Sequence, residues 1–118
     1  MYDAALEPVG VNVAQWGLLC RLEKAPVRPL SIHDLAKRSE LEQSTVGRNV
    51  RVLEKHGFVE LGESIEDRRA ATILLTGKGL AALEQGAPLW ENAQRQVEEM
   101  LGSQTASTLR SILLSVGS

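Results

Sequence analysis

The amino-acid sequence predicts a mainly α-helical fold with one small β-hairpin. The apolar residues are mostly Leu, Val, Ile and Ala, with two Trp, one Tyr and one Phe, and so aliphatic a core suggests helices packed on helices. Most apolar residues recur at helical spacing, whereas two short apolar runs flank a polar stretch, as in a hairpin. A chain of 118 residues fits one compact domain.

Composition and charge exclude several classes of protein. The hydrophobic fraction of 43% and the mean hydropathy of -0.10 are ordinary for a globular protein, and no run approaches the roughly 18 apolar residues of a membrane span. The first ten residues carry acids and no basic run, unlike a signal peptide. A single cysteine cannot form an internal disulfide, so we expect a cytoplasmic protein without a membrane partner. The formal net charge of -2 argues mildly against nucleic acid, unless the cations are clustered.

The first elements are predicted to be helices. Residues 1–9 resemble the end of a helix that stops near Pro8. Asn12 and Gln15 have the spacing of a capping box, in which each side chain accepts a hydrogen bond from the other residue's backbone amide. They predict a helix over about 13–24, followed by a loop with two prolines.

The next two helices are predicted to be separated by a tight turn. Ser31 is a predicted N-cap of a short helix, and residues 39–41 are the break after it. A longer helix is expected over about 42–56, with Gly57 as its C-terminal cap. The spacing i, i+4, i+7 predicts one buried face, made of Val46, Val50 and Leu53.

Two strands are predicted after this pair of helices, over 58–61 and 71–75. The intervening residues 62–70 are polar and charged, as expected of a long exposed hairpin tip. Short helix, tight turn, second helix and hairpin follow one another in the order of a winged helix-turn-helix.

A long helix and a final helix complete the prediction. Thr76 is a predicted cap for a helix over 77–101, in which Pro88 should introduce a bend. Its apolar positions alternate in steps of three and four, like a coiled-coil seam in which Gln94 fills one slot. These positions are 80, 83, 87, 90, 97 and 101. A last helix is expected over 104–116, with Leu109, Ile112, Leu113 and Val116 facing inward.

The exposed face of the helix over 42–56 has the chemistry of a DNA-reading surface. It carries Ser44, Thr45, Arg48, Asn49, Arg51 and Lys55. Arg and Asn have the bidentate geometries that suit guanine and adenine edges, and free amides at a helix N-terminus favour a phosphate. Arg51 also has a plausible ion-pair partner in Glu54, so phosphate contact and a solvated surface pair both remain open for it.

The hairpin tip is the second candidate contact. Arg68 and Arg69 are placed to reach away from the protein body, and the negative potential of a minor groove attracts arginine. Asp67 lies two residues before Arg69 and can hold that guanidinium in one pose.

The chain resembles the MarR family of bacterial transcription regulators over residues 2–116. The most specific pieces are STVGRNVRVLEKHGFVE, EDRRA and LLTGKG, and the segment APLWENAQRQVEEMLG resembles the family's dimerisation helix. The resemblance implies a winged-helix lobe over 12–76 and a helical dimerisation region over 1–10 and 77–118. The chain carries less of the first helix than family chains usually do, which puts the dimer area in doubt.

The same resemblance implies a function. The helix carrying Ser44, Thr45, Arg48 and Asn49 would enter the major groove of double-stranded DNA, and Arg69 would enter the minor groove. A homodimer would bind a palindromic operator as a repressor of nearby genes, and a small, often aromatic effector would release it. No cofactor is implied.

Several residues admit a plain and a functional interpretation. Cys20 is a buried thiol or an oxidation sensor, and its place on an apolar helix face favours the first. His33 and His56 lack the spacing of metal ligands, so we expect no metal site. Trp16 and Trp90 are core residues or the lining of an effector pocket. The sequence shows no nucleophile–base pair, carboxylate pair or phosphate-binding glycine loop, so we expect no catalytic residues and no enzyme.

An alternative function also fits the sequence. Basic and acidic residues balance over 28–71, and the first helix is short. A winged helix of this kind could be a protein-binding module that forms a heterodimer with a full-length regulator without binding DNA itself.

Overall fold

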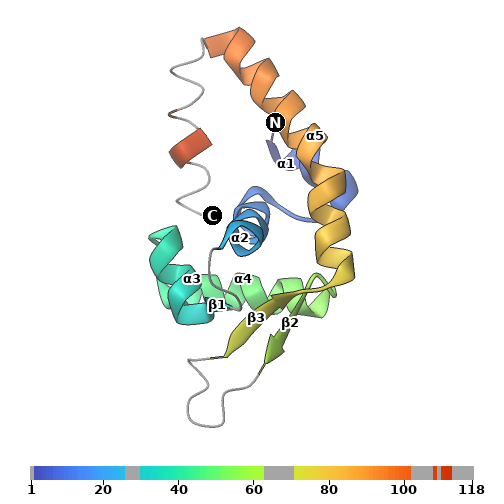
Figure 1. Cartoon of the computed structure of the whole chain (residues 1–118). Coiled ribbons are helices and arrows are strands. Elements are labelled where there is room, and N and C mark those ends of the chain that lie inside the picture. Colours follow the sequence, from blue (N-terminus) through green and yellow to red (C-terminus); the bar gives the residue numbers. More distant parts are fainter. Residues whose placement is uncertain (1, 26–29, 63–70, 102–107, 109, 113–118) are drawn as a thin grey trace.

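A computed structural model describes residues 2–25, 30–62, 71–101, 108 and 110–112 (Figure 1). It is a mainly helical fold with one small antiparallel sheet, as the sequence predicted. The elements are α1 (Tyr2–Leu6), the 3-10 helix η1 (Glu7–Val9), α2 (Val13–Lys24), β1 (Leu30–Ser31), α3 (Ile32–Ser39), α4 (Gln43–Lys55), β2 (Val59–Gly62), β3 (Thr72–Leu75) and α5 (Gly77–Leu101).

The predicted capping box fixes the start of α2. Asn12 Oδ1 accepts a hydrogen bond from the Gln15 amide at 2.8 Å, and Gln15 Oε1 accepts one from the Asn12 amide at 3.1 Å. The carboxylate of Asp3 accepts a third bond from the Val13 amide at 2.8 Å, which ties α1 to the same helix end. Three amides that no helical carbonyl can reach are thereby satisfied.

The turn between α3 and α4 is tight because Glu40 adopts a left-handed conformation. Ser31 Oγ accepts from the Asp34 amide at 3.0 Å, which confirms the predicted cap of α3. At the other end Glu40 has a φ of 56°, and its amide donates to the Lys37 carbonyl at 3.3 Å. The amide of Leu41 then donates to the Ala36 carbonyl at 3.1 Å. The predicted break is confirmed, but a glutamate gave no signal of the left-handed turn, which glycine usually supplies.

The sheet has three strands, one more than predicted, in the order β1–β3–β2. Leu30 and Ser31 pair with Ile73 and Thr72 of β3. Two residues are too short to show an alternating pattern, so sequence periodicity missed β1. The predicted hairpin strands are confirmed with a shift of one residue, and Gly62 opposite Thr72 is the last pair before the hairpin tip. That tip, residues 63–70, lies outside the described residues.

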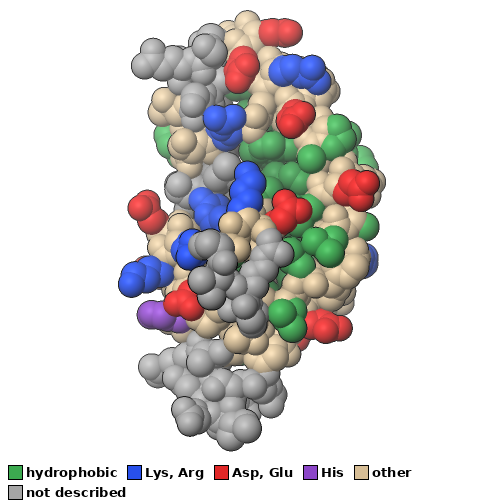
Figure 2. Space-filling view, viewed as in Figure 1, with side chains coloured by type: hydrophobic (Ala, Val, Ile, Leu, Met, Phe, Trp, Pro, Cys, Tyr) green, Lys and Arg blue, Asp and Glu red, His purple; other side chains and the backbone are tan. Residues whose placement is uncertain are grey.

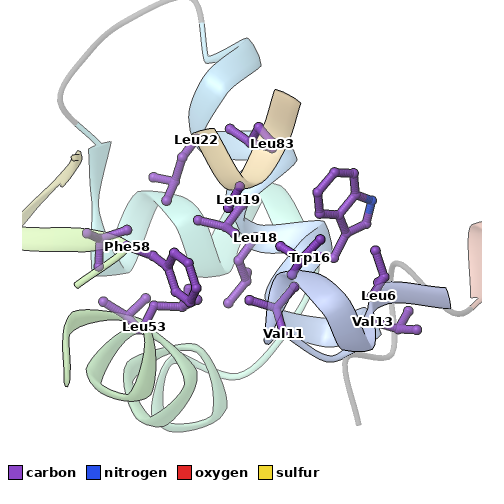
Figure 3. Packing of buried hydrophobic residues seen from close by; sticks show 14 of the residues in the cluster. Leu6, Val11, Val13, Trp16, Leu18, Leu19, Leu22, Leu53, Phe58 and Leu83 are labelled. Atoms are coloured by element: carbon purple, nitrogen blue, oxygen red, sulfur yellow. The ribbon is translucent and has the colours of Figure 1, made fainter. Parts of the chain in front are cut away.

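One hydrophobic core joins the helices to the sheet. Figure 3 shows side chains from α1, α2, α4 and α5 converging, among them Leu6, Leu18, Leu53 and Leu83, which are buried to 4% exposure or less.

The buried face of α5 differs from the predicted seam. Leu80 is 48% exposed and Ala87 is exposed, whereas the neighbouring Gly79 and Gly86 are buried. A Cβ at Gly86 would overlap the ring of Trp16. The helix therefore approaches the core through residues without side chains, which a search for apolar residues overlooks. Leu83, Trp90 and Val97, by contrast, are buried as predicted.

An aromatic cluster joins α1, α2 and α5. The rings of Tyr2 and Trp90 lie 4.6 Å apart between centroids, and those of Trp16 and Trp90 lie 6.3 Å apart. Tyr2, Trp16 and Trp90 come from α1, α2 and α5, so this cluster fixes three helices on one another.

The predicted last helix is only partly described. Residues 108 and 110–112 are helical, and Arg110 Nη1 donates to Gln94 Oε1 at 2.9 Å, so Gln94 pairs with the following helix. Ile112 was predicted to face inward but is 52% exposed. Periodicity alone could not say which side of this helix meets the rest of the chain. Leu109, Leu113 and Val116 lie outside the described residues, and α5 continues through Pro88.

We predict that Gly86→Ala destabilises the fold although alanine is the better helix former. Overpacking against Trp16 costs about 1–3 kcal/mol and helix propensity returns about 1 kcal/mol, so the free energy of unfolding should fall by up to about 2 kcal/mol. Gly47→Ala in α4 is the matched control, because a Cβ there meets nothing within 4 Å. That variant should gain about 0.5–1 kcal/mol in the same urea titration. Equal changes in the two variants would contradict the close contact.

Candidate nucleic-acid interface

Helix α4 is amphipathic, with one buried and one exposed face. Val46 and Val50 are fully buried and Leu53 is 1% exposed, so these three residues fix the rotation of the helix about its axis. Arg48 and Arg51 therefore lie on the opposite, exposed side. The helix lies beside the sheet, at the end of the molecule away from the far end of α5 (Figure 1).

The polar residues of α4 differ in how free they are. Ser44 and Lys55 are exposed like the two arginines, whereas Thr45 and Asn49 are half-buried. The side-chain nitrogen Nδ2 of Asn49 donates to the backbone carbonyl of Thr45 at 3.1 Å, within the same helix. A bidentate contact to adenine uses the side-chain oxygen and one N–H. The amide nitrogen carries two N–H donors, so the bond to Thr45 occupies only one of them and holds the amide plane in place.

The first backbone amides of α4 are free of a side-chain cap. Glu42 is the N-cap residue, and its side chain makes no capping hydrogen bond. The first turn of the helix contains no acidic residue. The first amides of a helix lack helical partners and carry partial positive charge, so this end can receive an anion such as a phosphate.

Two residues that were not predicted to lie at this interface meet at the same end of α4. Gln43 Oε1 lies 3.4 Å from His33 Nδ1, so a side chain of α3 meets the first residue of α4. The contact connects the two helices where both begin. The signal lay in the capping pattern, because Ser31 places His33 in the first turn of α3 and the break places Gln43 in the first turn of α4.

Exposed cations lie on both α3 and α4, interspersed with the exposed acids Asp34, Glu40, Glu42 and Glu54. Lys37 and Arg38 of α3 are exposed, as are Arg48 and Arg51 of α4. Figure 2 shows Lys and Arg side chains on the side of α3 and hydrophobic side chains over α5 and α1. The net charge of the chain therefore does not describe the local field, which decides the contact with an anion.

The wing residues predicted to contact DNA, Asp67, Arg68 and Arg69, lie outside the described residues. The structure describes only the base of the wing, where β2 ends at Gly62 and β3 begins at Thr72.

Trp16 and Trp90 are both in the core, at 2% and 8% exposure, and their part in an effector pocket stays a prediction. A pocket of about 410 Å³ lies elsewhere, along α2 and the end of α3, and neither tryptophan lines it. Its lining consists of Gly17, Cys20, Arg21, Lys24, Ala25 and Arg38.

Cys20 is half-buried in this pocket, and burial raises the pKa of its thiol to about 11. The thiolate is the reactive form of a cysteine, and with a pKa this high little thiolate is present near neutral pH. This favours the interpretation of Cys20 as a packed residue.

Other kinds of site find no support in the part of the chain that the structure describes. No group of three His, Cys, Asp or Glu side chains there could hold a metal ion. No helix among the described residues is both long and apolar enough to span a membrane.

Comparison with known proteins identifies relatives of this chain. Residues 9–70 match the model of the MarR family. The chain is 35% identical over 79 residues to the HTH-type transcriptional repressor YetL of Bacillus subtilis (strain 168), a match that covers 67% of this chain and 47% of YetL. Matches to other curated regulators likewise span about half the length of those proteins.

Solved structures have the same fold. The M. tuberculosis transcriptional regulator MosR superposes with a TM-score of 0.72 at 33% identity, covering 86% of this chain and 71% of MosR. The structure of MosR in complex with DNA gives a TM-score of 0.75 at 31% identity, covering 92% and 81%. The family match, the sequence relatives and the shared fold agree, and the chain belongs to the MarR family of winged-helix transcription regulators.

Proposed function

We propose that this chain is a sequence-specific DNA-binding regulator that acts as a homodimer on a palindromic operator. We further propose that it represses nearby genes, and that a small, often aromatic effector releases it. In this proposal residues 12–76 form the DNA-binding lobe, and residues 1–10 and 77–118 form the dimerisation region. The chain carries out no catalysis and acts in the cytoplasm, where the DNA is.

The observation that carries the proposal is the orientation of α4. Burial of Val46, Val50 and Leu53 leaves Arg48 exposed on the opposite side of the second helix of a helix-turn-helix. Such a helix is the one that enters a major groove, where arginine reads guanine. Ser44 and the uncapped first turn are well placed to accept a phosphate beside the groove.

The relatives support the same assignment. YetL is named a transcriptional repressor, and MosR has been solved bound to DNA. Repression is carried over from YetL, and release by an effector comes from the family resemblance alone.

We predict that Arg48→Ala relaxes base selection. Loss of a bidentate guanine contact costs about 1–3 kcal/mol, which corresponds to a rise of roughly 5- to 150-fold in Kd for the operator. Fluorescence anisotropy against a duplex from upstream of the gene, and against the same duplex with one base pair changed, measures the loss. Lys24→Ala, which removes an exposed cation from α2, is the control and should bind as the unchanged protein does.

Two outcomes would overturn the proposed function. One is operator binding that survives the combined change Arg48→Ala and Arg69→Ala. The other is a chain that captures a full-length relative in light scattering but binds no duplex at any salt concentration, which would favour the protein-binding module.

We predict a different signature for Arg51→Ala. A cation that contacts only phosphate adds affinity for every sequence, so its loss should weaken specific and scrambled duplexes alike. The slope of log K against log salt should fall by about one. An unchanged slope would show that Arg51 is a solvated surface residue.

A further inference from the structure

The end of α4 is held by the residues that begin α5. The helix ends in two capping bonds, from the Gly57 amide to the Glu54 carbonyl at 2.9 Å and from the Phe58 amide to the Leu53 carbonyl at 2.9 Å. Gly57 has a φ of 82°, as this cap requires, so the predicted glycine cap is confirmed. The carbonyls of His56, Gly57 and Phe58 follow the end of α4, so no amide of that helix can bond to them and they need other donors.

Residues 76–78 supply all three partners. Lys78 Nζ donates to the His56 carbonyl at 2.6 Å, and Thr76 Oγ1 donates to the Gly57 carbonyl at 2.6 Å. The Thr76 amide donates to the Phe58 carbonyl at 3.2 Å. Thr76 Oγ1 also accepts from the Gly79 amide at 3.1 Å, so one hydroxyl caps the start of α5 and binds the end of α4.

The contact is close as well as hydrogen-bonded. A Cβ at Gly79 would overlap the Phe58 carbonyl oxygen, so the backbone of α5 touches the residue that follows α4. The ammonium of Lys78 lies 4.9 Å from the centroid of the Phe58 ring, and it faces the negative end of the α4 dipole. Because the Phe58 side chain is buried, the junction is anchored in the core.

We propose that Lys78 is a positioning residue that fixes the direction of α4 relative to α5. This inference rests on the proposed function, in which α4 reads DNA and α5 belongs to the dimer stem. A dimer binds two half-sites only when both reading helices lie at the spacing of the duplex. The bond from Lys78 to His56 transmits the direction of the stem helix to the reading helix, so it contributes to DNA selection without touching a base.

The experiment compares Lys78→Met with Lys78→Arg. Methionine keeps an unbranched apolar side chain but removes the charge and the donor, whereas arginine restores both. Because Lys78 is exposed, we expect Lys78→Met to weaken operator binding roughly 2- to 5-fold, the size that an exposed cation at a helix C-terminus implies. Binding to a scrambled duplex and the salt slope should change little, and Lys78→Arg should recover most of the affinity. Lys24→Met, an exposed lysine of α2, is the matched control.

Other results would overturn the inference. A salt slope lower by about one, with equal losses on both duplexes, would make Lys78 a phosphate contact instead. A lower Tm with unchanged operator affinity below the melting range would make it a stabilising residue only. Failure of the arginine variant to recover the affinity would also count against the bond to His56.

A readout without DNA separates this inference from the proposed function. Spin labels on Glu54→Cys and Glu84→Cys in a Cys20→Ala chain, diluted with unlabelled chain, report the distance between the two exposed helix faces. Lys78→Met should broaden the distance distribution, and an unchanged distribution would contradict positioning. If the unchanged protein binds no duplex while the distribution still broadens, the proposed function fails and the positioning role of Lys78 stands.

Discussion

The fixed orientation of α4 is the constraint on which the rest of the interface depends. Val46, Val50 and Leu53 lie along one side of the helix and are completely buried or nearly so. Turning the helix about its axis would expose these three side chains and bury Arg48 or Arg51 without a partner, and both changes are costly. The hydrophobic core thus decides which polar side chains face outward, although it contains none of them.

The helix α5 shows a second use of packing. It packs on the core through Gly79 and Gly86, where no side chain of α5 separates the helix from Phe58 and Trp16. Close approach lets the side chains of Thr76 and Lys78 and the Thr76 amide reach the carbonyls of residues 56–58, which follow α4. The aromatic cluster of Tyr2, Trp16 and Trp90 then fixes the same helix farther along. Helix α5 is therefore joined to α1, α2 and the end of α4 by specific contacts and not by a free linker.

The placement of individual cations matters more than the sum of charges for the apparent conflict between an acidic chain and a nucleic-acid partner. The formal net charge of -2 describes the chain as a whole. The cations of α3 and α4 lie on exposed helix faces, and the N-terminal turn of α4 has no acidic residue. A phosphate responds to the potential within about a Debye length, about 8–10 Å in physiological salt, so the local arrangement outweighs the sum.

The sequence by itself determined the elements that local chemistry specifies. The capping box at Asn12, the cap at Ser31 and the buried stripe of α4 depend on residues within a few positions of one another, and each could be predicted. So could the exposure of Arg48, because it lies opposite the stripe. Tertiary structure alone decided the pairing of Leu30–Ser31 with β3 and the face by which α5 packs. It also decided the bonds from residues 76–78 to the end of α4. These features join segments far apart in the chain, and the residues that make them, such as a glycine or a two-residue strand, leave no periodic pattern for the sequence to show.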